Sequence, residues 1–181
     1  MAEHGGAQDG SGVDESDHHI VIDGRRWRAT DPSIPDGLRR ELVSELMSAR
    51  RAVGAATRAD DAEATRAARA RVQDAKVSLG ERGHPWWEPS PPEAFDQRIR
   101  STIATLLAHR GPERSICPSD AARVVGGASW RQAMEQVRNV ARELARRGEV
   151  RLTSGQRVLD PDGEIQGPIR IRPTSDDAVT A

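Results

Sequence analysis

Apolar residues between positions 36 and 80 recur at spacings of three and four, which predicts two amphipathic helices. The second helix is expected to begin near Asp60, with Glu63 completing a capping box, and to end at Gly80 or Gly83. Only a short loop joins the helices, so they are expected to pack as an antiparallel αα-hairpin. The inward stripes are Leu38, Leu42, Leu46, Ala49 and Val53 on the first helix, and Ala68, Val72, Ala75 and Leu79 on the second.

Two short strand-like runs come before these helices. Residues 19–22 read His-Ile-Val-Ile, residues 25–28 read Arg-Arg-Trp-Arg, and Asp23-Gly24 separates them. A type I′ turn needs positive φ at both central residues, and Asp-Gly is one of the pairs that tolerate it. The sequence therefore predicts a β-hairpin at this point.

A different order of elements is predicted after residue 95. Gly111-Pro112 ends a first helix, Cys117 is the N-cap of a second, and Gly126-Gly127 breaks that second helix. A capping box at Ser129 is expected to open a long helix that Gly148 closes. The predicted elements are a helix at 95–110, an extended piece at 115–116, helices at 118–126 and 130–147, and strands near 150–153, 157–159 and 169–172. This order is that of a winged helix.

The fold class predicted from these patterns is mainly α with short β-hairpins. A β-hairpin and an antiparallel two-helix module are followed by a winged helix-turn-helix domain. The expected organisation is a disordered acidic tail at 1–18, the hairpin and two-helix module at 19–89, a Pro-rich linker at 90–94, the winged-helix domain at 95–173 and a disordered tail at 174–181.

Charge is unevenly distributed along the chain. Residues 1–19 carry five acidic side chains and no Lys or Arg, whereas residues 90–173 carry 14 basic and 10 acidic ones. A basic body favours nucleic acid. Of the 27 basic residues only Lys76 is Lys, however, so the excess of Arg also fits a codon bias that leaves the charges as solvated surface.

Hydropathy and cysteine content indicate the compartment. No apolar run approaches the roughly 18–20 residues of a membrane helix. The first thirty residues lack the basic start and apolar middle of a secretory signal, and Cys117 is the only cysteine. We therefore expect a cytoplasmic protein without a membrane partner.

Two resemblances to known families follow from these motifs. Residues 97–173 contain the runs 116–119 (Ile-Cys-Pro-Ser), 130–131 (Trp-Arg) and 167–170 (Gly-Pro-Ile-Arg), and they resemble a bacterial domain family of unknown function with a winged-helix fold. Residues 20–89 contain the run from Val21 to Arg28 and the run from Gly83 to Trp87, and they resemble short bacterial proteins labelled biopolymer transporter Tol. Neither resemblance implies a substrate or a catalytic residue.

The polar face of the predicted helix 130–147 is a candidate nucleic-acid reader. Arginine pairs with guanine edges in the major groove, and Gln or Asn pairs with adenine edges. The alternative is a solvated surface, in which Glu135 and Glu143 pair with neighbouring arginines at helical spacing. The candidate residues on this face are Arg131, Gln132, Gln136, Arg138, Asn139 and Arg142.

The predicted wing adds four arginines. They are Arg151, Arg157, Arg170 and Arg172. Guanidinium groups on a β-hairpin can position a duplex through its phosphates. They can equally protect an exposed strand edge from pairing with another chain.

The remaining reactive side chains form no catalytic or metal set. Cys117 lies where a helix dipole lowers a thiol pKa, but Asp120 opposes that effect, so a structural cysteine is favoured. The five histidines are scattered, and neither a metal nor another cofactor is expected. Trp27, Trp86 and Trp87 are expected in the core of the first module or on its docking surface.

Three hypotheses on function remain from the sequence. The leading one is a non-catalytic winged-helix protein that binds duplex DNA through helix 130–147 and the wing. The alternative is a protein–protein adaptor that recruits a partner or self-associates through the two-helix module 36–80. The third is an enzyme dependent on Cys117.

Overall fold

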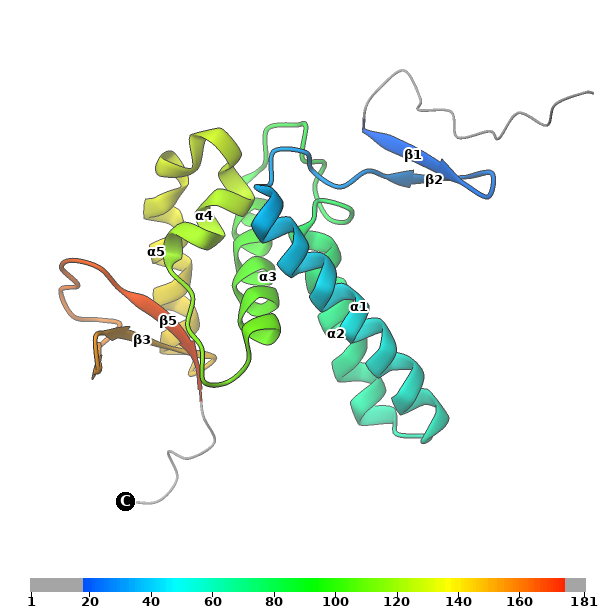
Figure 1. Ribbon diagram of the computed structural model, residues 1–181. Coiled ribbons are helices and arrows are strands. Elements are labelled where there is room, and N and C mark those ends of the chain that lie inside the picture. Colours follow the sequence, from blue (N-terminus) through cyan, green and yellow to red (C-terminus); the bar gives the residue numbers. More distant parts are fainter. Residues whose placement is uncertain (1–17, 175–181) are drawn as a thin grey trace, which may run out of the picture.

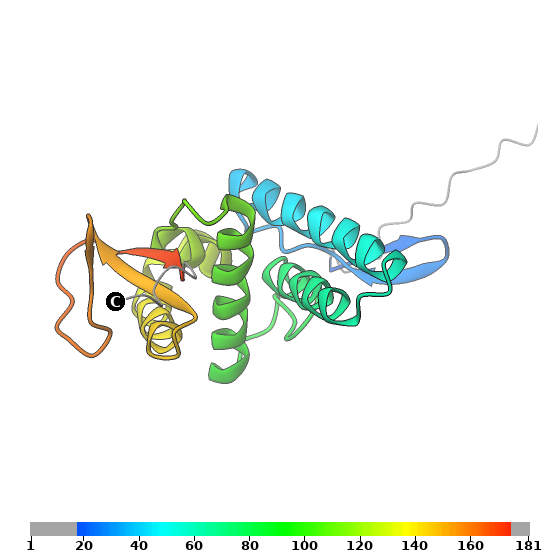
Figure 2. The ribbon, with the colours of Figure 1, turned by 90° about the horizontal axis from the view of Figure 1, so that it is seen from below.

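Helix α3 (Pro92–Arg110) stands at the centre of the molecule, between two other pairs of helices (Figure 1). The computed structural model describes residues 18–174, so the tails predicted at 1–18 and 174–181 lie outside the described residues, apart from His18 and Thr174. On one side of α3 lie α1 (Asp36–Arg58) and α2 (Ala62–Ser78). On the other side lie α4 (Pro118–Gly126) and α5 (Trp130–Arg146), with the C-terminal sheet beyond them (Figure 2).

The N-terminal hairpin forms as the sequence predicts. Strands β1 (His19–Ile22) and β2 (Arg25–Arg28) pair antiparallel, and Ile22 is the partner of Arg25 across a two-residue turn. Asp23 has φ 51° and Gly24 has φ 71°, so both central residues are left-handed. These are the angles that a type I′ turn requires, and the predicted turn is confirmed.

Helices α1 and α2 also confirm the predicted pair, with a correction at the start of α2. The N-cap of α2 is Asp61, whose carboxylate accepts a hydrogen bond of 2.8 Å from the backbone N–H of Ala64. Asp60 lies outside the helix with φ 53°, so the predicted capping box of Asp60 and Glu63 is wrong by one residue. Gly80, with φ 78°, ends the helix as expected.

The first helix of the C-terminal half begins earlier than the sequence predicts. Pro91 is the N-cap of α3, and Pro92 is its first residue. A proline fits the first helical turn because its fixed φ is helical and its missing N–H has no partner there. The predicted linker at 90–94 therefore overlaps the first turn of α3.

The helix-turn-helix pair contains a short 3₁₀ segment. Cys117 is the N-cap of α4, as predicted, and the segment η1 (Gly127–Ser129) leads directly into α5. The predicted capping box at Ser129 is wrong, because the Ser129 side chain makes no capping hydrogen bond. Its φ of −93° and ψ of 18° depart from the extended backbone in which a capping hydroxyl reaches the next turn.

The C-terminal sheet completes the winged helix. Strands β3 (Val150–Ser154), β4 (Arg157–Val158) and β5 (Arg170–Pro173) are antiparallel in the order β4-β3-β5. Ile116, ahead of α4, bridges to Ile171 of β5 through two backbone hydrogen bonds of 2.9 Å. The extended piece predicted at 115–116 thus joins the sheet beside β5.

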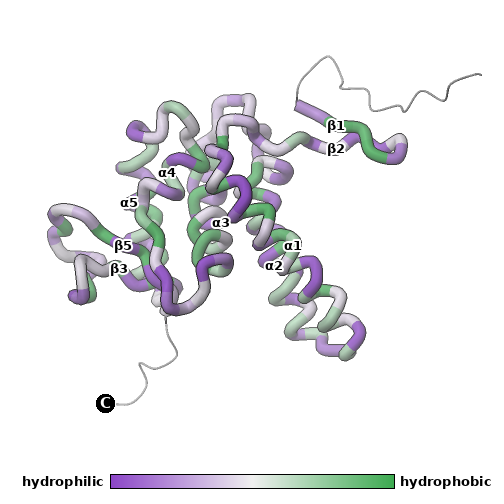
Figure 3. The backbone as a smooth tube through the Cα atoms, in the orientation of Figure 1, coloured by the Kyte–Doolittle hydropathy of each residue, from purple (hydrophilic) through white to green (hydrophobic). Residues whose placement is uncertain are grey.

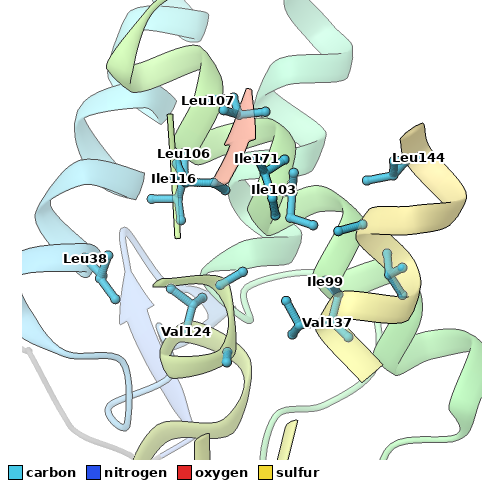
Figure 4. Packing of buried hydrophobic residues seen from close by; sticks show 14 of the residues in the cluster. Leu38, Ile99, Ile103, Leu106, Leu107, Ile116, Val124, Val137, Leu144 and Ile171 are labelled. Atoms are coloured by element: carbon cyan, nitrogen blue, oxygen red, sulfur yellow. The ribbon is translucent and has the colours of Figure 1, made fainter. Parts of the chain in front are cut away.

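One hydrophobic cluster runs through both halves of the chain. It contains Leu38, Leu42 and Leu79 from the α1–α2 pair together with the apolar faces of α3, α4, α5 and the sheet. Figure 4 shows Ile103, Ile116 and Ile171 meeting in the part of this cluster between α3 and β5. Separate folding of the two predicted modules stays a prediction. Across residues 18–174, no helix is both long enough and apolar enough to cross a membrane.

Candidate nucleic-acid interface

Helix α5 packs one face against the core and exposes the opposite face to solvent; we call the exposed side the open face. Ala133, Val137, Val140, Ala141 and Leu144 are buried, as the apolar stripe predicts. Trp130 and Met134, predicted on the same face, are half-buried at its margin. The opposite face exposes Arg131, Gln132, Glu135 and Asn139.

Three arginines of α5 keep guanidinium groups that no carboxylate neutralises within residues 18–174. Arg142 makes no ion pair there, and Arg131 lies over the Trp130 ring with 4.6 Å from Cζ to the ring centroid. Arg138 donates through Nη2 to the carbonyl of Gly167 at 3.2 Å. Positive charge therefore remains available along this helix.

The intrahelical ion pairs that the sequence allows are replaced by a contact with another helix. Glu143 accepts a hydrogen bond of 3.1 Å from Arg100 of α3. Glu135 is exposed and forms no ion pair with a described residue. The predicted pairing of Glu135 and Glu143 with arginines of their own helix is therefore wrong, whereas the solvated surface itself stays a prediction.

The amide side chains of α5 divide into two groups. Gln136 donates through Nε2 to the carboxylate of Asp96 on α3 at 2.6 Å, and it is half-buried. Gln132 and Asn139 are exposed on the open face. Of the three amides predicted to read bases, only these two are free to reach a partner.

The loop between β4 and β5 lies against α5. Arg146 of α5 pairs with Asp162 of the loop at 2.6 Å, and Arg138 bonds to Gly167. A cleft of about 220 Å³ lies between α5 and this loop. It is lined by Glu135, Arg138, Asn139, Arg142, Ile165 and Ile169. Residues 160–169 contain three carboxylates and no basic side chain, and with Asp162 paired to Arg146 the loop places the negative charges of Asp160 and Glu164 near α5.

The arginines predicted on the wing lie mainly on the sheet. Arg151 and Arg172 are direct partners across β3 and β5, and Arg170 is two residues before Arg172 on the same face. Their neighbours Val150, Leu152 and Ile171 are buried, which leaves the three arginines on the outer face. Arg157 is exposed on β4. The α5 residues other than Gln136 thus form one surface, and Arg151, Arg170 and Arg172 form another on the outer side of the sheet. Arg157 is the partner of Ser154, three residues after Arg151, so the register places it on the opposite side of the sheet from these three.

The position of Arg170 shows how far the second surface extends. Its Nε donates to the hydroxyl of Ser115 at 3.1 Å. It also lines a cleft of about 450 Å³ together with Arg110, Arg114 and Glu41. This places Arg170 beside the C-terminal end of α3.

One basic residue near α5 is absent from the sequence prediction. Arg123 is exposed on α4, and its Cζ lies 4.8 Å from the centroid of the Trp130 ring. Trp130 therefore has two guanidinium groups, those of Arg123 and Arg131, against its ring. The helical repeat of α4 gives no signal for this contact, because it depends on how α4 and α5 cross.

Two ionisable groups with shifted pKa values lie away from these arginines. Burial raises the pKa of Asp74 on α2, and a hydrogen bond of 2.8 Å from the Ser101 hydroxyl opposes the rise. The pKa of Arg110 is raised chiefly by its hydrogen bonds to Glu41, while burial opposes the rise and Asp120 adds to it. Both groups join α3 to neighbouring helices.

Cys117 is half-buried at the start of α4. Its backbone N–H donates to the Asp120 carboxylate at 3.2 Å, and the same carboxylate oxygen accepts from Arg110 at 2.8 Å. Asp120 thus caps the helix and pairs with Arg110, which places negative charge near the cysteine. Among residues 18–174, no three His, Cys, Asp or Glu side chains are arranged to hold a metal ion.

Part of the chain is similar to a family of known proteins. Residues 96–174 match a family described as "Protein of unknown function (DUF3253)". This match covers the winged helix and less than half of the 181-residue chain. No curated protein shows significant similarity to the chain. The resemblance of residues 20–89 to proteins labelled biopolymer transporter Tol lies outside the match and has no support from it.

Proposed function

We propose that this protein binds duplex nucleic acid, without catalysis, through the open face of α5. The observation that carries the proposal is the set of unneutralised guanidinium groups of Arg131, Arg138 and Arg142 on the second helix of a helix-turn-helix pair. Such helices lie in the major groove, where arginines meet phosphates and base edges.

The proposed contacts follow the exposure of each side chain. Arg131 and Arg142 contact phosphates, and Arg123 adds charge beside the N-terminal end of α5. Gln132 and Asn139 reach base edges, because both are exposed on the open face. Gln136 keeps its bond to Asp96, and Arg138 stays anchored to the wing loop. The sheet arginines Arg151, Arg170 and Arg172 are a second, sequence-independent phosphate surface, from which Arg157 is separated by the register of β4.

The test is a salt titration of the full chain with a fluorescent random-sequence duplex. We expect log K to fall linearly with log salt concentration. The double variant Arg131→Ala, Arg142→Ala should lower the magnitude of that slope by about 0.9 per lost phosphate contact.

A matched control removes the same charge elsewhere. Arg66 and Arg69 are exposed on α2, which packs on the other side of α3. The variant Arg66→Ala, Arg69→Ala should leave the slope near that of the unmodified protein. Equal losses in both double variants, or no salt-dependent binding at micromolar protein, would contradict the proposal.

A second candidate function is that of a protein–protein adaptor. The apolar groove between the N-terminal hairpin and α1 favours this function.

A further inference from the structure

A groove of about 670 Å³ separates the N-terminal hairpin from helix α1. We name it the hairpin groove. Its apolar lining is Ile20, Ile22 and Trp27 from the hairpin and Val43, Leu46 and Met47 from α1. In Figure 3 the hydrophobic stretch of β1 lies far from the apolar segments between α3 and α5, so the hairpin side of the groove is separate from the main core. Of the apolar lining, Leu46 belongs to that core.

The apolar lining follows from strand and helix geometry. Ile20 pairs with Trp27 across the hairpin, and alternate residues of a strand share a face, so Ile20, Ile22 and Trp27 lie together. Val43 and Met47 are four residues apart on α1, which places them one turn apart on the same side.

These side chains are exposed to an unusual extent for apolar groups. Ile22 is 52% exposed, Trp27 46% and Ile20 43%, and both helix residues are 37% exposed. Among residues 18–174 one other large apolar side chain is exposed, Val158 at 59% on β4. Five of six exposed apolar groups thus share one groove, and such clustering marks a binding surface rather than scattered surface residues.

The rim of the groove is positively charged. Arg25 and Arg50 line it and are exposed, and neither forms an ion pair with a described residue. Glu81 is already engaged, since its carboxylate accepts from Lys76 at 3.2 Å and from Thr30 at 3.0 Å. The Lys76 ammonium also lies 5.7 Å from the centroid of the Trp27 ring. Asp23 and Arg28 also line the groove and carry one charge of each sign, so the net charge left for a partner is positive.

We infer that the hairpin groove binds an amphipathic, acidic segment of another protein. The apolar side chains of the bound segment pack against Trp27 and Met47, and its carboxylates pair with Arg25 and Arg50 of this protein. A second copy of this chain is a poorer occupant. A symmetric contact through the groove brings two rims of net positive charge together, and like charges repel.

The test uses the full chain and labelled peptides of defined composition. The first is an amphipathic helical peptide of Leu, Ala and Glu; a second has Lys in place of Glu, and a third has Ser in place of Leu. We expect fluorescence anisotropy to show the acidic apolar peptide binding about tenfold or more tightly than either counterpart.

Variants locate the binding. Met47→Ser should weaken binding of the acidic peptide about tenfold, whereas Val158→Ser, an exposed apolar residue outside the groove, should leave it unchanged. The double variant Arg25→Glu, Arg50→Glu should reverse the preference toward the Lys peptide.

The contrary outcomes are equally specific. Equal affinity for the Glu and Lys peptides, or no binding of any peptide, overturns the inference. Concentration-dependent dimerisation that Met47→Ser abolishes also overturns it, because a second copy then occupies the groove. Duplex binding should not change in Met47→Ser, which alters no charge, so this result is independent of the proposed function.

Discussion

Asp31, ahead of α1, and Arg98 of α3 form an ion pair with 2.7 Å between Oδ2 and Nη2. The two side chains are 4% and 13% exposed, so the pair lies inside the protein. Asp31 also accepts hydrogen bonds of 2.8 and 2.7 Å from the backbone N–H and the hydroxyl of Ser33. Its own N–H donates to the carbonyl of Leu79 at 2.9 Å. One aspartate thus joins the start of α1, the end of α2 and α3.

Removing this carboxylate should destabilise the whole chain. Asp31→Ala leaves Arg98 buried without its partner, and we expect the free energy of unfolding to fall by about 3–5 kcal/mol. Urea denaturation measures the loss. Asp36→Ala is the control, because the pair of Asp36 with Arg39 is exposed and should contribute about 0–1 kcal/mol. A similarly small decrease in the free energy of unfolding in both variants would show that the Asp31–Arg98 pair does not hold α1, α2 and α3 together.

Asp74 should make stability depend on pH in the acidic range. Burial raises its folded-state pKa above the usual 3.8, so the folded protein binds this proton more tightly than the unfolded chain. The free energy of unfolding therefore decreases as pH rises from 3.8 through the raised value. Asp74→Asn keeps an acceptor for Ser101 and removes the titration, so it should be more stable than the unmodified protein at pH 7.

Denaturation at several pH values between about 4 and 7 checks this prediction. Glu63→Gln, which changes an exposed carboxylate on the same helix, should preserve the pH dependence of the unmodified protein. If Asp74→Asn also preserves the pH dependence of stability, the buried Asp74 carboxylate does not cause that dependence.

Gly127 should tolerate no side chain, for two separable reasons. Its φ is 49°, and an added Cβ would lie 2.8 Å from the Cβ and Oγ of Ser33. Gly111, with φ 85°, has open space around the same position. Gly111→Ala should therefore lower stability by about 1–2 kcal/mol through backbone strain alone, and Gly127→Ala should lower it further. Thermal unfolding compares the two, and equal losses would mean that Ser33 moves aside without cost.

Gln132 and Asn139 should govern sequence preference if α5 lies in the major groove. Replacing both by Ala should change discrimination between duplexes by about 1–3 kcal/mol per base contact. The salt dependence should stay the same, because neither side chain is charged. Competition binding against a duplex library measures the first effect and a salt titration the second. Gln136→Ala, whose amide is held by Asp96, is expected to leave sequence preference unchanged.

Cys117 should be replaceable. Ser is itself a good N-cap, so Cys117→Ser should change the free energy of unfolding by about 1 kcal/mol at most and leave duplex binding intact. Loss of function with an unchanged circular dichroism spectrum would instead support the hypothesis of a Cys117-dependent enzyme.

Local patterns in the sequence are enough to predict most of the architecture. The stripe that begins at Leu38, the Asp23-Gly24 turn and the N-cap at Cys117 each depend on residues within one or two turns of each other. The same holds for the order of elements in the winged helix. The errors at Asp60 and Ser129 are errors of cap geometry, where a shift of one residue or a 3₁₀ turn changes which side chain reaches the backbone.

The hydrogen-bond and ion-pair partners of the polar side chains cannot be predicted from local patterns, because they depend on how distant helices pack. Glu143 lies near arginines on its own helix, yet it pairs with Arg100 of α3, 43 residues away. Gln136 bonds to Asp96, 40 residues away, and Asp31 meets Arg98 across 67 residues. The same packing leaves Arg142 without an acid and Trp27 exposed beside Met47. The sequence alone determines which residues share a face of an element; the tertiary structure decides which two faces meet, because that depends on how distant elements cross.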